Sequence, residues 1–246
     1  MRPDCAMVLA AGLGTRMRPL TNDKPKSLVE VDGQTLIDRA LDQLAKAGVK
    51  TAVINHHYKS EKLLSHLSAR QSGLPALRFS DEKDELLETG GGIKKALPLF
   101  TSDPFFSINC DVIWTDGADN TLSRLAAHWD DEKMDGLLLM IPIGRARGHA
   151  GAGDFFLTDT RDMRDVGRLA WRGEAKQAPY VFAGIQLVST RLYRDTPEGP
   201  FSNLRLWDRA IGEGRLFGLV HQGGWVDIGT PQGRDDAEAW LQQNRP

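Results

Sequence analysis

A glycine-rich stretch near the N-terminus constrains the fold of this chain more than any other part of its sequence. Residues 7–9 (Met-Val-Leu) form an apolar run typical of a buried strand, and residues 10–15 continue as Ala-Ala-Gly-Leu-Gly-Thr. Small side chains leave the backbone open to a ligand, and its N–H groups can then turn inward around an anion. Four cationic residues follow closely, namely Arg16, Arg18, Lys24 and Lys26. A strand, an open loop and clustered positive charge together predict a polyphosphate site.

Two familiar phosphate-binding loops do not fit this stretch. A dinucleotide-binding fingerprint needs Gly or Ala where this chain has Met17, which is too large for close packing of helix on strand. A P-loop needs Gly-Lys-Ser or Gly-Lys-Thr at the start of a helix, and the stretch has neither. Pro19 predicts that the backbone stays irregular after the glycines. An ordinary turn with solvated Arg and Lys side chains is the alternative, but the clustering of the cations disfavours it.

Length and composition favour one α/β domain. The chain has 246 residues, of which 41% are hydrophobic and 26% charged, so we expect a single globular domain over residues 1–246. The formal net charge of -2 gives no general attraction to nucleic acid, and no apolar run has the length of a membrane helix or the form of a signal peptide. Cys5 and Cys110 are too few for a disulfide framework and lack metal-site spacing. We therefore expect a cytoplasmic protein without nucleic-acid or membrane partners.

Strand and helix patterns alternate after the glycine loop. Apolar residues at helical spacing predict a helix over residues 36–47, ended by Gly48, and another over residues 60–67 with Ser60 as its N-cap. The further elements expected in this part are strands at residues 51–54, 77–80, 105–108 and 137–143 and a helix at residues 122–129. This alternation is typical of a largely parallel sheet with helices on both faces.

The later part of the chain is less regular. Residues 144–153 are rich in Gly, Arg and His and predict a loop, and residues 154–178 have no regular pattern. A strand is expected at residues 181–188 with Gly184 in its middle, which often means that another group approaches the backbone closely. The last expected elements are a helix at residues 204–211, a strand at residues 216–220, and a helix capped by Thr230 with Pro231 at its first position.

Residues 9–21 (Leu-Ala-Ala-Gly-Leu-Gly-Thr-Arg-Met-Arg-Pro-Leu-Thr), with Lys-Pro-Lys at residues 24–26, resemble the signature of the sugar-1-phosphate nucleotidyltransferases. The resemblance extends from Ala6 to about Thr230. It implies the three-layer α/β/α fold of that family, which is Rossmann-like and has a mostly parallel mixed sheet. It also implies a reaction in which a sugar-1-phosphate attacks the α-phosphorus of a nucleoside triphosphate in line and releases pyrophosphate. Positioning and charge neutralisation dominate such a reaction, and the ionised attacking phosphate needs no general base.

The resemblance assigns the nucleotide to two glycine segments. The first is the loop already described, and the second is Leu-Glu-Thr-Gly-Gly-Gly-Ile at residues 87–93, which taken alone is typical of a flexible turn. We expect the second segment to form a backbone platform under the base or ribose, with a helix beginning at Gly92. The implied nucleotide-binding residues are Ala10, Ala11, Gly12, Gly14, Thr15, Arg16, Lys26, Glu88, Thr89, Gly90, Gly91 and Asn109.

Asp111 and Asp227 are the expected metal ligands. Asp111 follows an apolar strand, at the end where α/β sheets bind ligands, and Asp227 lies in Trp-Val-Asp-Ile-Gly-Thr. Each has the alternative role of a cap or turn residue, but Mg²⁺ would explain carboxylates that face a triphosphate, and it takes one or two of them. The resemblance implies catalytic roles for Arg16 and Lys26 on the phosphates and for Asp111 on Mg²⁺, so we expect Asp111 and Asp227 to converge on one ion. Cys110 stands where the family usually has Gly, and we expect a buried, inert thiol.

The residues expected to bind the sugar phosphate are Asn55, Asp154, Gly184 and Asp227. Residues 148–155 (Gly-His-Ala-Gly-Ala-Gly-Asp-Phe), together with the second glycine segment, most resemble members that use UTP and N-acetylmuramate-1-phosphate; GTP and mannose-1-phosphate are the alternative. The candidate counter-charges for the lactyl carboxylate of muramate are Arg145, Arg147 and His149. The expected partners are therefore small molecules, an NTP and a sugar-1-phosphate. An inactive nucleotide-sugar sensor is a further alternative, and the sequence leaves monomer and dimer open.

Overall fold

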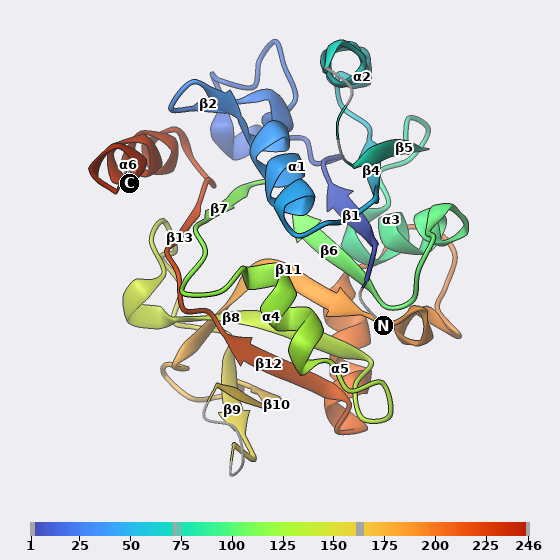
Figure 1. The fold of residues 1–246 in the computed structure, drawn as a ribbon, viewed down its shortest axis with the longest axis vertical. Coiled ribbons are helices and arrows are strands. Elements are labelled where there is room, and N and C mark those ends of the chain that lie inside the picture. Colours follow the sequence, from blue (N-terminus) through green and yellow to red (C-terminus); the bar gives the residue numbers. More distant parts are fainter. Residues whose placement is uncertain (1–2, 71–72, 74, 161–164, 245–246) are drawn as a thin grey trace.

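The computed structural model describes residues 3–70, 73, 75–160 and 165–244, and a nine-stranded sheet crosses its centre in the order β5-β4-β1-β6-β11-β8-β12-β10-β9 (Figure 1). Its strands are β1 (Cys5–Leu9), β4 (Thr51–His56), β5 (Ala76–Asp81), β6 (Phe105–Asn109), β8 (Gly136–Pro142), β9 (Phe155–Thr158), β10 (Val166–Trp171), β11 (Tyr180–Val188) and β12 (Leu216–Val220). Two small ribbons accompany it, namely β2 (Glu30–Val31) with β3 (Gln34–Thr35) and β7 (Val112–Trp114) with β13 (Trp225–Asp227).

The sheet changes character at its middle. Strands β5, β4, β1 and β6 are all parallel to one another, as the alternation of strand and helix predicts. From β6 onward the pairs β6–β11, β11–β8, β12–β10 and β10–β9 are antiparallel. Among the described strands of this half, β8 and β12 form the one parallel pair. The two halves lie at the top and bottom of Figure 1.

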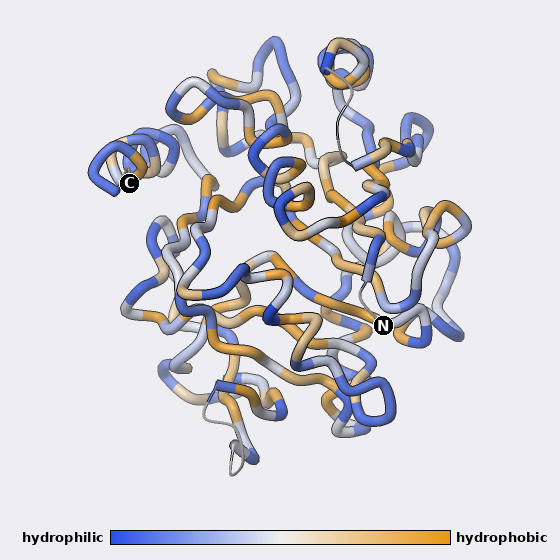
Figure 2. The backbone as a smooth tube through the Cα atoms, viewed as in Figure 1, coloured by the Kyte–Doolittle hydropathy of each residue, from blue (hydrophilic) through white to orange (hydrophobic). Residues whose placement is uncertain are grey.

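Alternation along the strands builds a core on each face of the sheet. In β1, Ala6 and Val8 pack into one buried cluster while Cys5 and Met7 pack into the other. The first cluster includes residues of α1 (Leu36–Lys46) and α4 (Thr121–His128), and the second those of α3 (Glu88–Ala96) and α5 (Asn203–Gly212). Figure 2 shows the hydrophobic residues concentrated along the central strands. The result is the three-layer α/β/α arrangement that the resemblance implies.

The remaining helices are α2 (Ser60–Ala69) and α6 (Pro231–Gln243). The predicted cap of α6 is confirmed, because the Oγ1 atom of Thr230 accepts a hydrogen bond of 3.1 Å from the N–H of Gly233. The predicted cap of α2 is wrong: Ser60 is the first helical residue, and the N-cap is Lys59 in the left-handed conformation, with φ 51°. Among the described helices, none combines the length and apolar character that crossing a membrane requires.

Two further predictions are corrected by the structure. Part of residues 154–178, expected to be irregular, forms β9 and β10, which pair at the edge of the sheet. Helix α3 begins at Glu88 instead of Gly92, so the three glycines lie inside its first turns. Their small size serves packing, because a Cβ at Gly90 would collide with the ring of Phe201 and one at Gly91 with the carbonyl of Gly199. Consecutive glycines thus mark a tight helix–loop contact here.

Candidate active site

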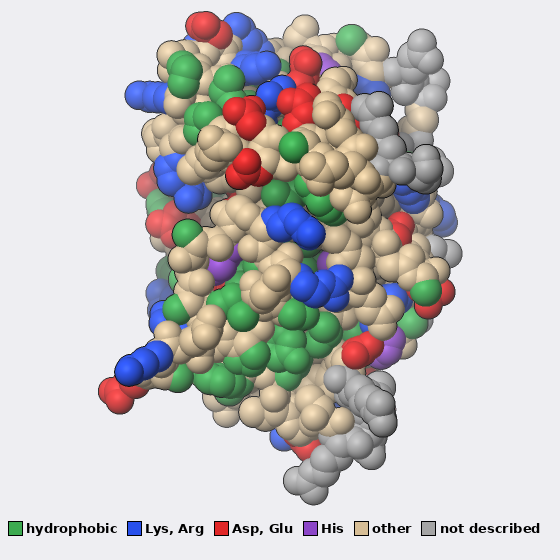
Figure 3. Space-filling view, turned by 90° about the vertical axis from the view of Figure 1, so that its left-hand side faces the viewer, with side chains coloured by type: hydrophobic (Ala, Val, Ile, Leu, Met, Phe, Trp, Pro, Cys, Tyr) green, Lys and Arg blue, Asp and Glu red, His purple; other side chains and the backbone are tan. Residues whose placement is uncertain are grey.

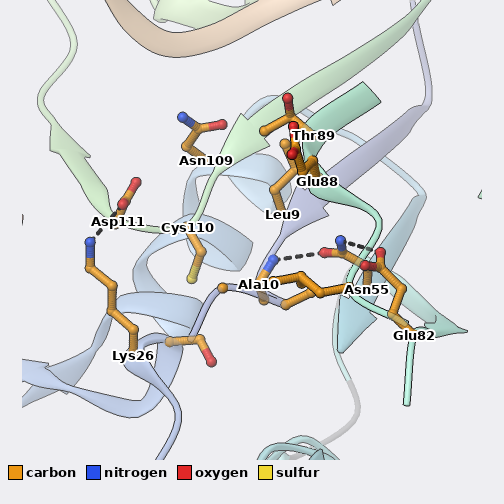
Figure 4. A pocket seen from close by; sticks show the side chains of 14 residues that line it. Leu9, Ala10, Lys26, Asn55, Glu82, Glu88, Thr89, Asn109, Cys110 and Asp111 are labelled. Atoms are coloured by element: carbon orange, nitrogen blue, oxygen red, sulfur yellow. Dashed lines mark hydrogen bonds and ion pairs between the residues drawn. The ribbon is translucent and has the colours of Figure 1, made fainter. Parts of the chain in front are cut away.

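The carboxyl ends of the parallel strands surround a cavity of about 230 Å³, which we call the glycine-loop cavity (Figure 4). The glycine loop comes directly from β1, Asn55 lies in β4, and Asn109 ends β6. Since parallel strands end at the same edge of a sheet, the topology alone brings these segments together. The lining residues are Leu9, Ala10, Ala11, Gly12, Lys26, Ser27, Asn55, Glu82, Leu86, Glu88, Thr89, Asn109, Cys110 and Asp111.

A chain of buried hydrogen bonds fixes one wall of this cavity. The N–H of Ala10 donates to Oδ1 of Asn55 at 2.7 Å, and Nδ2 of Asn55 donates to Oε1 of Glu82 at 2.7 Å (Figure 4). The other oxygen of Glu82 accepts a hydrogen bond of 3.0 Å from the N–H of Leu87, just before α3. The glycine loop, β4 and the start of α3 are therefore held by one carboxylate. Glu82 was not predicted as a site residue; its signal in the sequence was a carboxylate just after a predicted strand.

The two glycines of the loop have different roles. A Cβ at Gly12 would meet no atom within 4 Å, so this glycine leaves space at the cavity wall. Gly14 has φ 63°, and a Cβ there would lie 3.1 Å from side-chain carbons of both Lys26 and Thr21. Gly14 therefore lets the turn close against the segment that carries Lys26. Gly14 and Thr15 do not line the cavity themselves.

Lys26 and Asp111 form an ion pair at the mouth of the cavity. Nζ of Lys26 lies 2.6 Å from Oδ2 of Asp111, and the two side chains are 14% and 31% exposed (Figure 4). Lys26 begins a short 3-10 helix (Lys26–Leu28), and Asp111 lies in the turn between β6 and β7. A cation and a carboxylate far apart in sequence thus meet next to the glycine loop.

A second cavity of about 380 Å³, which we call the aromatic cavity, adjoins the first. The two have Thr89, Asn109 and Asp111 in common, so they form one continuous cleft. The aromatic cavity is lined by Arg16, Thr89, Asn109, Asp111, Val112, His149, Asp154, Phe155, Trp171, Val181, Phe182, Gly184, Ser202, Asn203, Leu204, Trp207, Trp225 and Asp227. On the face shown in Figure 3, Lys and Arg side chains border a hydrophobic patch near the middle of the view.

The β7–β13 ribbon brings Asp111 and Asp227 together. Asp227 pairs with Val112, and the N–H of Ile228 donates to the carbonyl of Asp111 at 2.9 Å. Burial raises the pKa of the Asp227 carboxyl, and the negative charge of Asp111 raises it further. The charges of Lys26, Arg16 and His149 act in the opposite direction. Two carboxylates and three positively charged or protonatable groups therefore interact where the cavities meet.

Gly184 and Asp154 shape the far wall of the aromatic cavity. The register of β11 against β8 shifts between Phe182 and Gln186, and Gly184 lies inside this bulge with φ 75°. A Cβ at Gly184 would come within 3.2 Å of Asn109, so the glycine allows β11 to pass close to the shared lining. Oδ2 of Asp154 accepts a hydrogen bond of 2.9 Å from the N–H of Phe182. Asp154, Gly184 and Asp227 thus share one cavity.

Comparison with known proteins identifies the fold and the reaction class. The model of the MobA-like NTP transferase domain matches residues 6–176. The chain is 45% identical to an N-acetylmuramate α-1-phosphate uridylyltransferase of Caulobacter vibrioides, over 97% of both chains, and 32% identical to one of Neisseria meningitidis, over 95% of this chain and 96% of that protein. The structure of a UDP-glucose pyrophosphorylase complexed with UDP-glucose superposes with a TM-score of 0.80 at 14% identity, covering 99% of this chain and 100% of that one. The chain belongs to the sugar-1-phosphate nucleotidyltransferase family.

Members of this nucleotidyltransferase family generally use a divalent metal ion. In the described part of the chain, no group of three or more His, Cys, Asp or Glu side chains is placed to hold a metal. Asp111 and Asp227 nevertheless provide two interacting carboxylates at the junction of the cavities. Two carboxylates are sufficient for Mg²⁺, because phosphate oxygens and water complete its coordination. The donor set of this nucleotidyltransferase therefore fits such an ion.

Several expected site residues of the nucleotidyltransferase lie elsewhere. Asn55 lines the glycine-loop cavity and does not join the other three residues expected to bind the sugar phosphate. Gly90 and Gly91 line neither cavity. The side chain of Arg145 donates to the backbone carbonyls of residues 221–223, and that of Arg147 lies over the ring of Trp240. Of the loop cations named as counter-charges, only His149 lines the cleft.

The aromatic walls of the nucleotidyltransferase were not predicted as site residues. Phe155, Trp171, Phe182, Trp207 and Trp225 line the second cavity, with the rings of Phe155 and Trp171 stacked at a centroid distance of 4.5 Å. They come from different strands and from α5, so no local spacing in the sequence predicts that they meet. Cys110 is 5% exposed, its backbone is not left-handed, and burial raises the pKa of its thiol, as expected for an inert cysteine.

Proposed function

We propose that this nucleotidyltransferase transfers UMP from UTP to N-acetylmuramate-1-phosphate, giving UDP-N-acetylmuramate and pyrophosphate. One observation carries the proposal: a backbone-lined cavity and an aromatic cavity meet at Asp111, Thr89 and Asn109. A nucleotide in the first and a sugar phosphate in the second would bring the α-phosphorus and the attacking oxygen together at this junction. The relatives named for N-acetylmuramate α-1-phosphate support the choice of acceptor and of base.

The role proposed for each residue follows from its place in the cleft. The open backbone at Ala10, Ala11 and Gly12 would hold the nucleotide, and Arg16 would hold the departing phosphates through two parallel hydrogen bonds. Lys26 would contact both the α-phosphate and the incoming phosphate, and so hold them in line. No side chain has to move a proton, because the attacking phosphate is already an anion.

Asp111 and Asp227 would hold Mg²⁺. When bound, the ion offsets negative charge on the phosphates as the two anionic substrates approach each other. Lys26 would then exchange its contact with Asp111 for contacts with phosphate, so the ion pair keeps its ammonium group near the junction until substrate arrives. We also propose that residues 1–246 act as one domain, because one sheet carries both cavities, and that the enzyme works in the cytoplasm.

A pyrophosphate-release assay tests this function. Each of the four nucleoside triphosphates is paired with N-acetylmuramate-1-phosphate, N-acetylglucosamine-1-phosphate and mannose-1-phosphate. UTP with N-acetylmuramate-1-phosphate should give the highest kcat/KM of all these pairs. A preference for GTP with mannose-1-phosphate would overturn the acceptor and base. Release from no pair, with tight binding of UDP-N-acetylmuramate, would identify an inactive sensor.

A further inference from the structure

The aromatic cavity continues into a side chamber of about 390 Å³ that the reaction does not require. This chamber, which we call the annex, is lined by Gly153, Asp154, Trp171, Arg172, Gly173 and Leu204. Asp154, Trp171 and Leu204 also line the aromatic cavity, so the two spaces are continuous. A substituent on a sugar that lies against Asp154 therefore has room to extend toward Arg172.

The backbone of Arg172 is held in place, but the charge of its side chain is not matched by the protein. Its N–H donates to the carbonyl of Asp154 at 2.8 Å, and it follows Trp171, whose Nε1 donates to Asp208 at 2.6 Å. Within the described part of the chain, the half-buried Arg172 side chain has neither an ion pair nor a hydrogen bond. By contrast, Arg191 and Arg215 both pair with the carboxylate of Asp135.

The other cationic or protonatable groups of the cleft lie near Asp227. Arg16, Lys26 and His149 all lie close enough to Asp227 for their charges to act on it. The annex has no lining residue in common with the glycine-loop cavity, and Arg172 is the cation that lines it. Leu204, which is 51% exposed, adds an apolar surface beside the guanidinium. The annex thus combines one positive charge with an apolar wall, which suits a short carboxylate-bearing group with a methyl branch.

We propose that Arg172 binds a carboxylate carried by the acceptor sugar and so selects acidic over neutral sugar phosphates. This inference rests on the proposed function and adds the residue that recognises the carboxylate of the acceptor sugar. A guanidinium and a carboxylate form two parallel charge-assisted hydrogen bonds, which fix both the charge and the direction of the substituent. Trp171 and Leu204 flank the lactyl group of N-acetylmuramate, while the phosphate remains at the junction with Lys26.

The variant Arg172→Gln tests the inference with two acceptors that differ only in the lactyl group. With UTP, kcat/KM for N-acetylmuramate-1-phosphate should fall about 10- to 100-fold through KM, as expected for loss of a charge-assisted pair. The value for N-acetylglucosamine-1-phosphate should not change. The methyl ester of the acid should react with the parent enzyme as the acid reacts with the variant. Lys176→Gln is the matched control, because Lys176 is an exposed cation of the same segment that does not line the annex.

Calorimetric binding of the products UDP-N-acetylmuramate and UDP-N-acetylglucosamine gives a second measurement that does not depend on turnover. The variant should lose affinity for the first about 10- to 100-fold and keep its affinity for the second. Equal losses for both ligands, or no loss for either, would overturn the role of Arg172 and leave the proposed function standing. A parent enzyme that does not accept N-acetylmuramate-1-phosphate would overturn both.

Discussion

The two cavities of the cleft present different chemical groups to a ligand. The glycine-loop cavity lies at the ends of parallel strands and presents backbone, fixed by the buried bonds between Ala10, Asn55 and Glu82. The aromatic cavity lies against the antiparallel half and presents side chains, among them Trp171 and Trp207. Backbone groups suit a triphosphate, which every nucleotide shares. Side chains suit a sugar, because they can differ between enzymes without disturbing the strands.

The same difference predicts how the two sides respond to mutation. A change on the nucleotide side should affect every acceptor equally, since the triphosphate is common to all reactions. A change on the acceptor side should affect one sugar more than another. Asp111 lines both cavities, and Asp227 lies close enough for the charge of Asp111 to act on it, so the loss of either carboxylate should be the most severe and the least selective.

Asp227→Asn should produce the largest loss. The substitution keeps the shape but removes one of two carboxylates at the junction, and we expect kcat to fall about 100- to 1,000-fold with every acceptor. The melting temperature should not fall, because burial and Asp111 already raise the pKa of Asp227 and so disfavour its charged form. Pyrophosphate release and thermal unfolding measure the two effects. Asp119→Asn, an exposed carboxylate outside the cleft, is the control. Parent-level turnover would exclude Asp227 from the site.

The sequence predicts the segments around the glycine-loop cavity but not the aromatic walls of the second cavity, and the reason is topological. The glycine loop, the strand before it and Asp111 lie in short continuous segments, so their chemistry is visible in local spacing. Parallel strands then align these segments at one edge without further information. The aromatic cavity instead collects single residues from β9, β10, β11 and α5, whose meeting depends on tertiary packing.

Local patterns also mislead where packing decides. The three glycines of residues 90–92 predict a loop, but the contact with residues 199–201 makes them the packing face of a helix. Residues 154–178 have little local preference for strand, and β9 and β10 form at the edge of an existing sheet. Glu82 lies in a charged segment that is typical of a loop, yet it is 1% exposed. In each case a partner distant in sequence supplies the missing constraint.

Arg16→Ala should be the next largest effect. Although Arg16 lines the aromatic cavity and not the glycine-loop cavity, we expect its loss to act through the triphosphate where the two cavities meet. Loss of a bidentate contact to phosphate should raise KM for UTP about 10- to 100-fold and slow turnover. The fold should remain intact, since Arg16 is exposed. Steady-state kinetics with varied UTP measure the change, and the variant should lose the same factor with either acceptor. Arg18→Ala removes an exposed charge that lines neither cavity, and its kinetics should match those of the parent. An unchanged KM and rate for Arg16→Ala would remove Arg16 from the site.

Glu82→Gln should give a smaller loss of the same kind. Both Glu82 oxygens accept hydrogen bonds, from Asn55 and Leu87, and a Gln side chain would present an N–H donor to one of these donors. The resulting mismatch should lower the free energy of unfolding by about 1–3 kcal/mol. KM for UTP should rise about tenfold, as expected for roughly 1.4 kcal/mol, while KM for the acceptor stays unchanged. Glu85→Gln, at an exposed position on the same segment, is the control. An increase in the acceptor KM alone would contradict a role on the nucleotide side.

The smallest effect separates two buried histidines, one on each half of the sheet. His56 ends β4, and His221 follows β12 next to Arg145. Burial lowers the pKa of both rings, and the ring of His221 is the more deeply buried of the two. The effect is partly offset at each ring, by the charge of Asp81 at His56 and by a hydrogen bond to the Gly224 carbonyl at His221. Below about pH 6.5 each imidazole binds a proton more readily in the unfolded chain than in the folded protein. The free energy of unfolding therefore decreases as the pH falls, by up to about 1.4 kcal/mol per pH unit and group. Urea unfolding between pH 7.5 and 5.5 should therefore show a flatter pH dependence for His221→Gln than for the parent, and a smaller flattening for His56→Gln. Equal slopes in all three proteins would mean that neither ring resists protonation. A larger effect at His56 would mean that burial does not decide which ring resists protonation more strongly, because His221 is the more buried.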